Sequence, residues 1–140
     1  MNKVVYLDHI NDPGNLGTII RTALALDYDA VVISKDSVSI YNEKTIAATK
    51  GALFLMPILE GEIKDFDSSY SVVVSTLNDK SQDLKDIKPL DKFVLVLGNE
   101  AHGVCQDSID RADLMVKIPV NNIDSLNVSV AAGILMYYLR

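Results

Sequence analysis

Apolar and polar residues follow one another along the chain in blocks that predict alternating strands and helices. Short runs of apolar, often β-branched residues are typical of buried strands, whereas apolar residues three or four positions apart indicate helices. This pattern predicts strands over residues 4–7, 30–33, 54–58, 70–77, 93–97 and 114–118. It predicts helices over residues 16–26, 43–50 and 125–139, and a helical turn with a loop in the polar stretch 80–92.

The predicted strands are mostly apolar along their whole length, and this indicates the kind of sheet they form. Apolar strands separated by helices favour a parallel sheet that is covered on both faces, so the predicted fold class is α/β. In such sheets, ligands bind beyond the carboxyl ends of the strands. Polar clusters occupy residues 9–21, 98–104 and 119–127, each directly after a predicted strand. Functional side chains are therefore expected in these three clusters.

Length and composition indicate one compact domain over residues 1–140, because 49% of the residues are hydrophobic. No apolar run approaches the roughly 20 residues that span a bilayer, and the N-terminus turns acidic too early for a signal peptide. With Cys105 as its one cysteine, the chain has no internal disulfide, and a cytoplasmic location away from membranes is expected. The formal net charge of −6 has the wrong sign for holding nucleic acid by overall electrostatics.

The first polar cluster belongs to the segment DHINDPGNLGTIIRTA, residues 8–23. Pro13 and Gly14 suit a turn, and Asn15 is expected to cap the helix that follows. Arg21 lies within two turns of the start of that helix. Local features alone leave open whether Arg21 is a functional residue or an ordinary surface arginine.

The second and third clusters have simple structural explanations as well as functional ones. In LGNEAHGV, residues 97–104, Gly98 can let the backbone approach a ligand closely, while Glu100 can equally be a solvated turn residue. The chain has no Gly-Lys-Ser/Thr phosphate loop and no Gly-x-Gly-x-x-Gly dinucleotide motif after its first strand. The third cluster leads into an apolar helix that Ser125 or Asn127 can cap, and its N-terminus can hold a polar or anionic group.

Taken together, the three clusters resemble the SpoU/TrmH family of RNA methyltransferases. Members carry the pattern D-P-x-N-x-G-x-x-x-R-T-A, which residues 12–23 match, and G-N-E-x-x-G after a buried strand, which residues 98–103 match. They also carry I-P-M followed by S-L-N-V-S-x-A, which residues 118–120 and 125–131 match with Val120 in place of Met. His9 stands where the first motif usually opens with Asn, and no role is assigned to it. The resemblance runs from about residue 4 to residue 139.

The resemblance implies a parallel α/β fold with a deep trefoil knot in its C-terminal third, and a homodimer whose paired knots build the active site. It implies S-adenosylmethionine as cofactor and the ribose 2′-hydroxyl of RNA as methyl acceptor, with ribosomal RNA favoured over transfer RNA. DNA is excluded because it lacks that hydroxyl. The implied cofactor contacts are Thr76, Leu77, Leu97, Gly98, Asn99, Glu100, Ile118, Val120, Ser125, Leu126 and Asn127.

The resemblance also assigns the chemistry. Arg21 has the central role at the 2′-hydroxyl, and because a guanidinium normally stays protonated in proteins, it is expected to stabilise the developing alkoxide or to clamp a phosphate. No metal is expected, since the methyl donor is already activated and His9, His102 and Cys105 lack metal-ligand spacing. The full set of implied catalytic residues is Asn15, Arg21, Glu100, Ser125 and Asn127.

Two features of the chain leave alternatives open. Relatives that modify ribosomal RNA usually carry a separate N-terminal RNA-binding domain, whereas this sequence starts at the first strand of the catalytic domain. Together with the acidic charge, this leaves open a module that binds S-adenosylmethionine and dimerises without methylating RNA alone. An α/β enzyme with different nucleotide chemistry is a further alternative, weakened by the missing glycine motif. Lys35, Lys44 and Lys50 form either an RNA-facing patch or ordinary solvated lysines.

Overall fold

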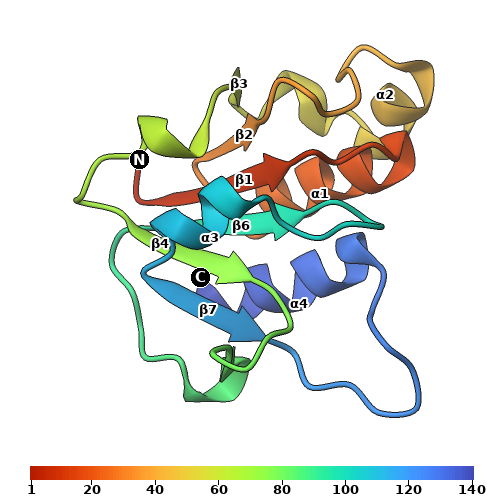
Figure 1. Ribbon diagram of the computed structural model, residues 1–140. Helices are drawn as coiled ribbons and strands as arrows, with labels where there is room; N and C mark the ends of the chain where they lie inside the picture. Colours follow the sequence, from red (N-terminus) through yellow and green to blue (C-terminus); the bar gives the residue numbers. More distant parts are fainter.

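The computed structural model describes residues 1–140 and has a central parallel sheet with helices on both faces (Figure 1). The sheet has seven strands in the order β3-β2-β1-β6-β4-β7-β5, and every neighbouring pair is parallel. The strands are β1 (Lys3–Asp8), β2 (Ala30–Ile33), β3 (Ile58–Glu60), β4 (Ser71–Ser75), β5 (Gln82–Asp83), β6 (Phe93–Gly98) and β7 (Leu114–Lys117). The predicted α/β fold with a parallel sheet is thus confirmed.

The helices divide between the two faces of the sheet. In Figure 1, α1 and α4 lie behind the sheet and α3 lies in front of it. The α-helices are α1 (Pro13–Ala25), α2 (Glu43–Thr49), α3 (Gln106–Arg111) and α4 (Val128–Leu139), and the short 3-10 helices are η1 (Ala52–Phe54), η2 (Ile63–Asp65) and η3 (Leu84–Asp86). None of these helices combines the length and the apolar character that crossing a bilayer requires.

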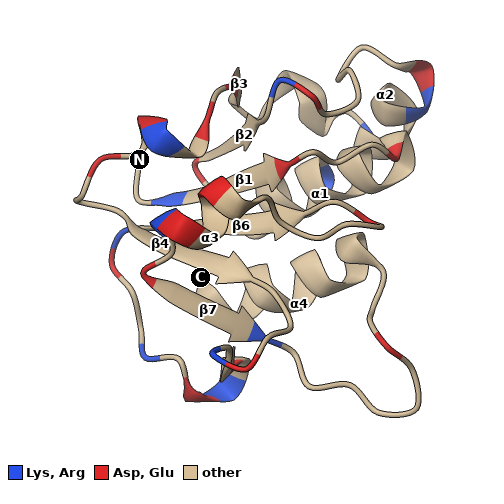
Figure 2. Ribbon diagram, in the orientation of Figure 1, with Lys and Arg blue, Asp and Glu red and all other residues tan.

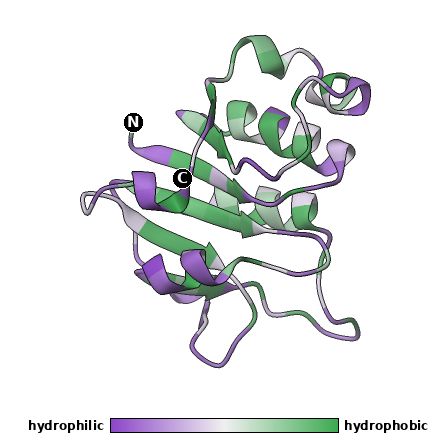
Figure 3. Ribbon diagram, turned by 45° about the horizontal axis from the view of Figure 1, so that its top comes forward, coloured by the Kyte–Doolittle hydropathy of each residue, from purple (hydrophilic) through white to green (hydrophobic).

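Alternate residues of the central strands supply two separate cores. On β1, Val5 and Leu7 pack into the larger core together with buried residues of α1 and α4, while Val4 and Tyr6 face the smaller core on the other side. This alternation follows from the two-residue repeat of a strand. Figure 3 shows most of the sheet as hydrophobic, with hydrophilic residues common in the loops around it. Polar side chains can therefore gather beyond the strand ends, where the site is expected.

The start of α1 differs from the prediction in a way that matters for the site. The helix begins at Pro13, and Asp12 caps it by accepting hydrogen bonds from the backbone N–H groups of Gly14 (2.8 Å) and Asn15 (3.1 Å). The prediction that Asn15 is the cap is wrong, because proline lacks an N–H and suits the first helical position, which moves the cap to Asp12. Asn15 is inside the first turn, and its side chain is left for another partner.

Other boundaries also differ from the prediction. Helix α4 starts at Val128 with Asn127 as its cap, so Ser125 precedes the helix instead of opening it. The strand predicted over residues 54–58 is wrong in position: η1 occupies part of it and β3 begins only after Pro57, which cannot donate a ladder hydrogen bond. Strand β4 ends at Ser75, so Thr76 and Leu77 lie in the loop beyond it. The short, polar α3 was not predicted.

Candidate functional site

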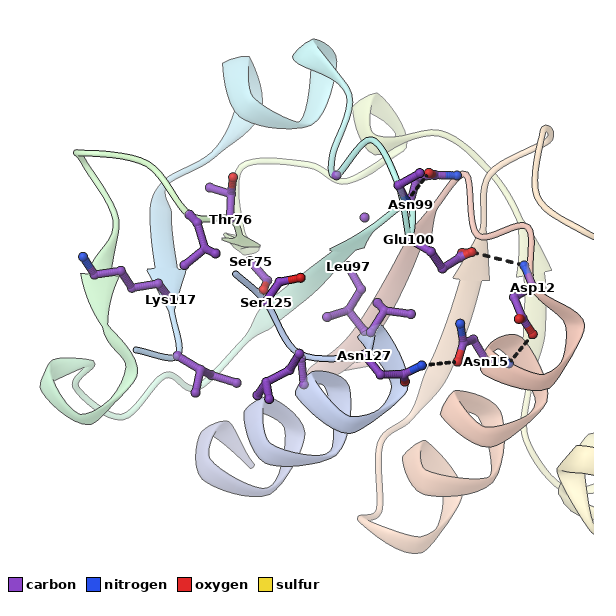
Figure 4. Close-up of a pocket in the computed structure, with 18 of the residues that line it drawn as sticks. Asp12, Asn15, Ser75, Thr76, Leu97, Asn99, Glu100, Lys117, Ser125 and Asn127 are labelled. Carbon is purple, nitrogen blue, oxygen red and sulfur yellow. Dashed lines mark hydrogen bonds between the residues drawn. The ribbon is translucent and has the colours of Figure 1, made fainter. Parts of the chain in front are cut away.

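A cavity of about 900 Å³ opens beyond the carboxyl ends of the neighbouring strands β6, β4 and β7 (Figure 4). The loop before α1, the loops after these three strands, and the start of α4 all contribute to its wall. The lining residues are Asn11, Asp12, Asn15, Ser75, Thr76, Leu77, Leu97, Gly98, Asn99, Glu100, Ala101, Gly103, Lys117, Ile118, Val120, Ser125, Leu126, Asn127, Val128 and Ala131. All three polar clusters of the sequence therefore meet at one place.

The structure brings most of the expected site residues together. Every residue that the family resemblance assigned to cofactor binding lines the cavity, and so do Asn15, Glu100, Ser125 and Asn127 from the catalytic set. Arg21 is the exception, because it is exposed on α1 and does not line the cavity. Arg21 is not among the buried residues of α1, which are Leu16, Gly17, Ile19, Ile20 and Ala23.

Sequence reasoning missed several lining residues. Asn11 and Asp12 stand inside the first motif, so their place at the cavity follows from the motif once the helix cap is assigned correctly. Ser75 and Lys117 end β4 and β7, and the rule that ligands bind at carboxyl ends of strands was the available signal. Ala131 lies one turn inside α4, and the sequence carried no sign that the cavity extends that far.

The wall built from residues 98–103 depends on the absence of a side chain at Gly98. A Cβ atom there would lie 2.4 Å from the carbonyl carbon of Gly103 and 2.5 Å from the nitrogen of Val104. Asn99 and Gly103 pair through two backbone hydrogen bonds, of 2.8 and 2.9 Å. Gly98 therefore lets the chain's own returning loop approach closely, and the approach of a ligand to this glycine stays a prediction.

Asn99 and Glu100 fasten this loop to the first motif. The Asn99 amide donates to the carbonyl of His9 (2.7 Å). The Glu100 carboxylate accepts from the backbone N–H groups of Asn11 (3.0 Å) and Asp12 (3.2 Å), as Figure 4 shows for Asp12. Hydrogen bonds to an ionised carboxylate are stronger than neutral ones. Glu100 is exposed, but it also joins the loop of the second motif to the first motif through these hydrogen bonds.

The first and third motifs meet through two asparagines. The Asn127 amide nitrogen donates to Oδ1 of Asn15 across 3.2 Å, and the two side chains point toward one another in Figure 4. At the same time Oδ1 of Asn127 accepts from the backbone N–H groups of Ser129 (2.8 Å) and Val130 (3.3 Å). Asn127 therefore caps α4 and links it to α1, although 112 residues separate the two asparagines.

Comparison with known proteins agrees with this arrangement of motifs. A model of the SpoU rRNA Methylase family matches residues 2–137. The chain belongs to this family.

Two curated relatives are similar to this chain over nearly its whole length. It is 35% identical over 99% of its length to the Bacillus subtilis 23S rRNA (guanosine(2553)-2′-O)-methyltransferase RlmP, of which it covers 58%. It is 35% identical over 97% of its length to the uncharacterized tRNA/rRNA methyltransferase MG252 of Mycoplasma genitalium, of which it covers 60%. The chain thus spans somewhat more than half the length of these relatives.

Solved structures of the family have the same fold. The AdoMet-bound rRNA methyltransferase from Sinorhizobium meliloti superposes with a TM-score of 0.91 at 33% identity, over 98% of this chain and 55% of that one. The SpoU methyltransferase AviRb from Streptomyces viridochromogenes, in complex with AdoMet, gives a TM-score of 0.88 at 26% identity, over 96% of this chain and 58% of that one. The fold that positions the cavity is therefore shared with these methyltransferases.

Gly98 gives a direct test of how the cavity wall is held. We expect Gly98→Ala to lower the free energy of unfolding by about 1–3 kcal/mol, the usual cost of overpacking, because the added methyl overlaps backbone atoms of residues 103 and 104. Amide hydrogen exchange should also become faster at Asn99 and Gly103, while β1 remains protected. The control is Ala101→Ser in the same loop, at an exposed position. Unchanged exchange at Asn99 and Gly103 in Gly98→Ala would contradict this account.

Proposed function

We propose that this chain is the S-adenosylmethionine-binding catalytic domain of an RNA ribose 2′-O-methyltransferase. The observation that carries the proposal is the single cavity at which all three family motifs meet. The names of the relatives support the reaction, since the Bacillus subtilis protein is a 23S rRNA guanosine 2′-O-methyltransferase by name, and two of the similar structures contain AdoMet. Ribosomal RNA is the substrate class we favour, on the name of that Bacillus relative.

The cavity suits the proposed cofactor in size and in chemistry. Its volume of about 900 Å³ falls within the usual range for small-molecule sites, and its mixture of apolar walls with a few polar groups is typical of them. Leu97, Ile118 and Val120 offer apolar surface for an adenine ring, and Ser125 and Asn127 offer polar groups for the ribose and the amino acid part. When bound, S-adenosylmethionine supplies a methyl group on a sulfonium, already activated for transfer.

The knot of the family belongs to the same proposal. Strand β7 pairs with β4, yet α4, which follows it, returns to pack against α1 and β6. The connection over residues 118–127 leads from β7 to α4 past the cavity, and it can be followed in Figure 1. This path supports a knotted C-terminal third, in which the connection itself provides cofactor contacts.

Arg21 suggests that the active site is shared between two subunits. It is the expected catalytic residue that lies outside the cavity, on the exposed side of α1. Helix α4, which packs against α1, exposes apolar side chains: Val130, Ile134 and Tyr137 are 53%, 42% and 62% exposed. Exposed apolar surface of this kind is typical of protein interfaces. We infer a homodimer through this surface, in which Arg21 of the partner subunit completes each cavity.

In the dimer, each side chain has a role that its chemistry supports. The guanidinium of Arg21 is a planar, permanently charged donor, so it holds the phosphate beside the target ribose or stabilises the developing 2′-alkoxide. The Asn15–Asn127 pair offers hydrogen bonds that align the ribose oxygen. Glu100 keeps the loop before α1 in place, and the 2′-hydroxyl proton leaves through the phosphate or through water.

A second candidate function is a cofactor-binding dimerisation module that does not methylate RNA by itself. The net charge of −6 favours it. Figure 2 shows Lys and Arg at separate positions along the ribbon, without one strongly basic element. RNA affinity would then come from sequence outside this chain, such as the N-terminal RNA-binding domain usual in the family, and the two candidates differ in one measurable property.

The two functions are separated by a methyl-transfer assay with the isolated chain. We expect it to bind S-adenosylmethionine at one site per subunit in a calorimetric titration, and to transfer labelled methyl to unmodified ribosomal RNA. The product should contain a phosphodiester that resists alkaline cleavage, since methylation removes the attacking 2′-hydroxyl. Cofactor binding without transfer would support the dimerisation module. A folded chain that binds no cofactor would contradict both functions.

A subunit-mixing experiment tests whether Arg21 acts across the dimer. Arg21→Ala and a variant with a filled cavity, Val120→Trp, should each be inactive alone. If Arg21 acts on the partner's cavity, dimers formed from both variants carry one complete site, so an equal mixture should regain about a quarter of the wild-type activity by random pairing of subunits. Co-expression allows the subunits to mix.

Two controls make the result decisive. Val120→Trp must remain dimeric and lose cofactor binding, and Arg21→Ala must retain cofactor binding. No recovery in mixtures that contain the mixed dimer would mean that Arg21 acts within its own subunit. Arg21→Lys should lose at least about tenfold in transfer rate, because lysine lacks the planar, bidentate geometry.

A further inference from the structure

A cluster of three potential metal ligands lies outside the cavity, behind the loop of the second motif. It consists of Asp8 at the end of β1, His9 directly after it, and Cys105 before α3. Their ligand atoms all lie within 4.8 Å of one another. Nδ1 of His9 is 2.6 Å from Oδ1 of Asp8 and 3.1 Å from Sγ of Cys105. None of the three side chains lines the cavity.

We propose that Asp8, His9 and Cys105 form a binding site for a transition-metal dication of the Zn²⁺ type. A thiolate, an imidazole and a carboxylate together are ligands that Zn²⁺ accepts, whereas Mg²⁺ and Ca²⁺ prefer oxygen ligands alone. One thiolate and one carboxylate also neutralise a dication. Charge neutralisation is needed because Asp8 is only 2% exposed, and burying a charge without a partner costs free energy.

The groups around the cluster orient its ligand atoms. Oδ2 of Asp8 accepts hydrogen bonds from the backbone N–H of Cys105 (2.7 Å) and from the hydroxyl of Ser108 (2.9 Å), so Oδ1 is turned toward His9. Nε2 of His9 lies 3.0 Å from Oδ2 of Asp36, so Nδ1 is the ring nitrogen that faces Cys105. A carboxylate on the far nitrogen of a ligating histidine is a recurrent feature of metal sites.

The backbone at His9 holds the ring in this position. His9 has a φ of +61°, a left-handed conformation that is uncommon for residues other than glycine. Its N–H donates to the Ser34 hydroxyl (2.8 Å), and its carbonyl accepts from the Asn99 amide (2.7 Å). Strained residues persist where their surroundings fix them, and they are concentrated at functional sites. The contact with Asn99 also joins the cluster to the cavity wall.

Metal binding needs only a small rearrangement of the cluster. With bonds of about 2.0–2.3 Å in a tetrahedral site, neighbouring ligand atoms lie roughly 3.3–3.6 Å apart. At present Nδ1 of His9 lies 2.6 Å from Oδ1 of Asp8 and 3.1 Å from Sγ of Cys105, which are hydrogen-bond distances. A bound metal ion would take the place of the hydrogen-bonded protons. His9 is partly exposed, which leaves the ion a way in.

Distances along the chain could not reveal this cluster. Asp8 and His9 are adjacent, but Cys105 follows 96 residues after His9, and it reaches them because β1 and β6 pair in parallel. The expectation of no metal rested on the already activated methyl donor, which concerns the reaction, and on ligand spacing. The fold removes the argument from spacing, because it brings Cys105 to Asp8 and His9. The fourth ligand position is left for water, as in zinc sites with three protein ligands.

Cobalt spectroscopy of the tag-free chain tests the proposal. Titration with Co²⁺ should produce a thiolate-to-cobalt charge-transfer band that saturates at one ion per chain, and Zn²⁺ should abolish it. Cys105→Ser should remove the band. His9→Asn should weaken Co²⁺ binding at least about tenfold, by comparison with losses at other metal sites, and it should fold because asparagine tolerates a left-handed φ. His102→Asn, at an exposed histidine outside the cluster, should bind Co²⁺ like the unmodified chain.

A second measurement guards against unfolded variants. Zn²⁺ should raise the thermal midpoint of the unmodified chain and of His102→Asn, and leave that of Cys105→Ser unchanged, because an ion that binds only the folded state stabilises it. Absence of the charge-transfer band in the folded, unmodified chain would overturn the proposal. Equal Co²⁺ affinity in His9→Asn and the unmodified chain would overturn it as well.

Discussion

Strand β6 is the element on which the rest of the structure depends. It pairs in parallel with β1 on one side and β4 on the other, and its residues from Phe93 to Leu97 are buried. Both of its faces are covered, so the chain can present polar groups only where the strand ends. Gly98 ends the strand and, without a Cβ, lets the loop fold back onto it. This folded-back loop forms part of the cavity wall. It also carries Asn99 and Glu100, which bond to His9 and to the loop before α1.

Three hydrogen-bonded connections hold the three motifs together around the cavity at the end of β6. Glu100 joins the second motif to the loop before α1, Asn99 joins it to His9, and Asn127 joins the third motif to Asn15. Each connection links segments about 90 residues apart or more along the chain. Because Asn127 also caps α4, and Asn99 also accepts hydrogen bonds within its own turn, the site and the local structure are stabilised together. A change in one motif is therefore expected to affect the other two.

The sequence predicts the parallel sheet and the composition of the site better than it predicts element ends. Strands such as residues 93–97 are recognisable because they are continuous and apolar, while α3 is too short and polar to stand out. The cap of α1 was misassigned because Asn15 and Asp12 are both good capping residues, and only the placement of Pro13 decides between them. Cavity residues were identified through motif resemblance. The position of Arg21 outside the cavity, and the meeting of His9 with Cys105, depend on tertiary structure and have no local signal.

We propose that S-adenosylmethionine binds in the cavity beyond β6. The most direct test is to add S-adenosylhomocysteine to the isotope-labelled chain and to follow the backbone amide signals by NMR. We expect saturable shifts that concentrate at residues 76–77, 97–100 and 118–127, with little change on the opposite edge of the sheet around β3. Unchanged signals at residues 97–100 under saturating ligand, or shifts confined to another surface, would contradict it.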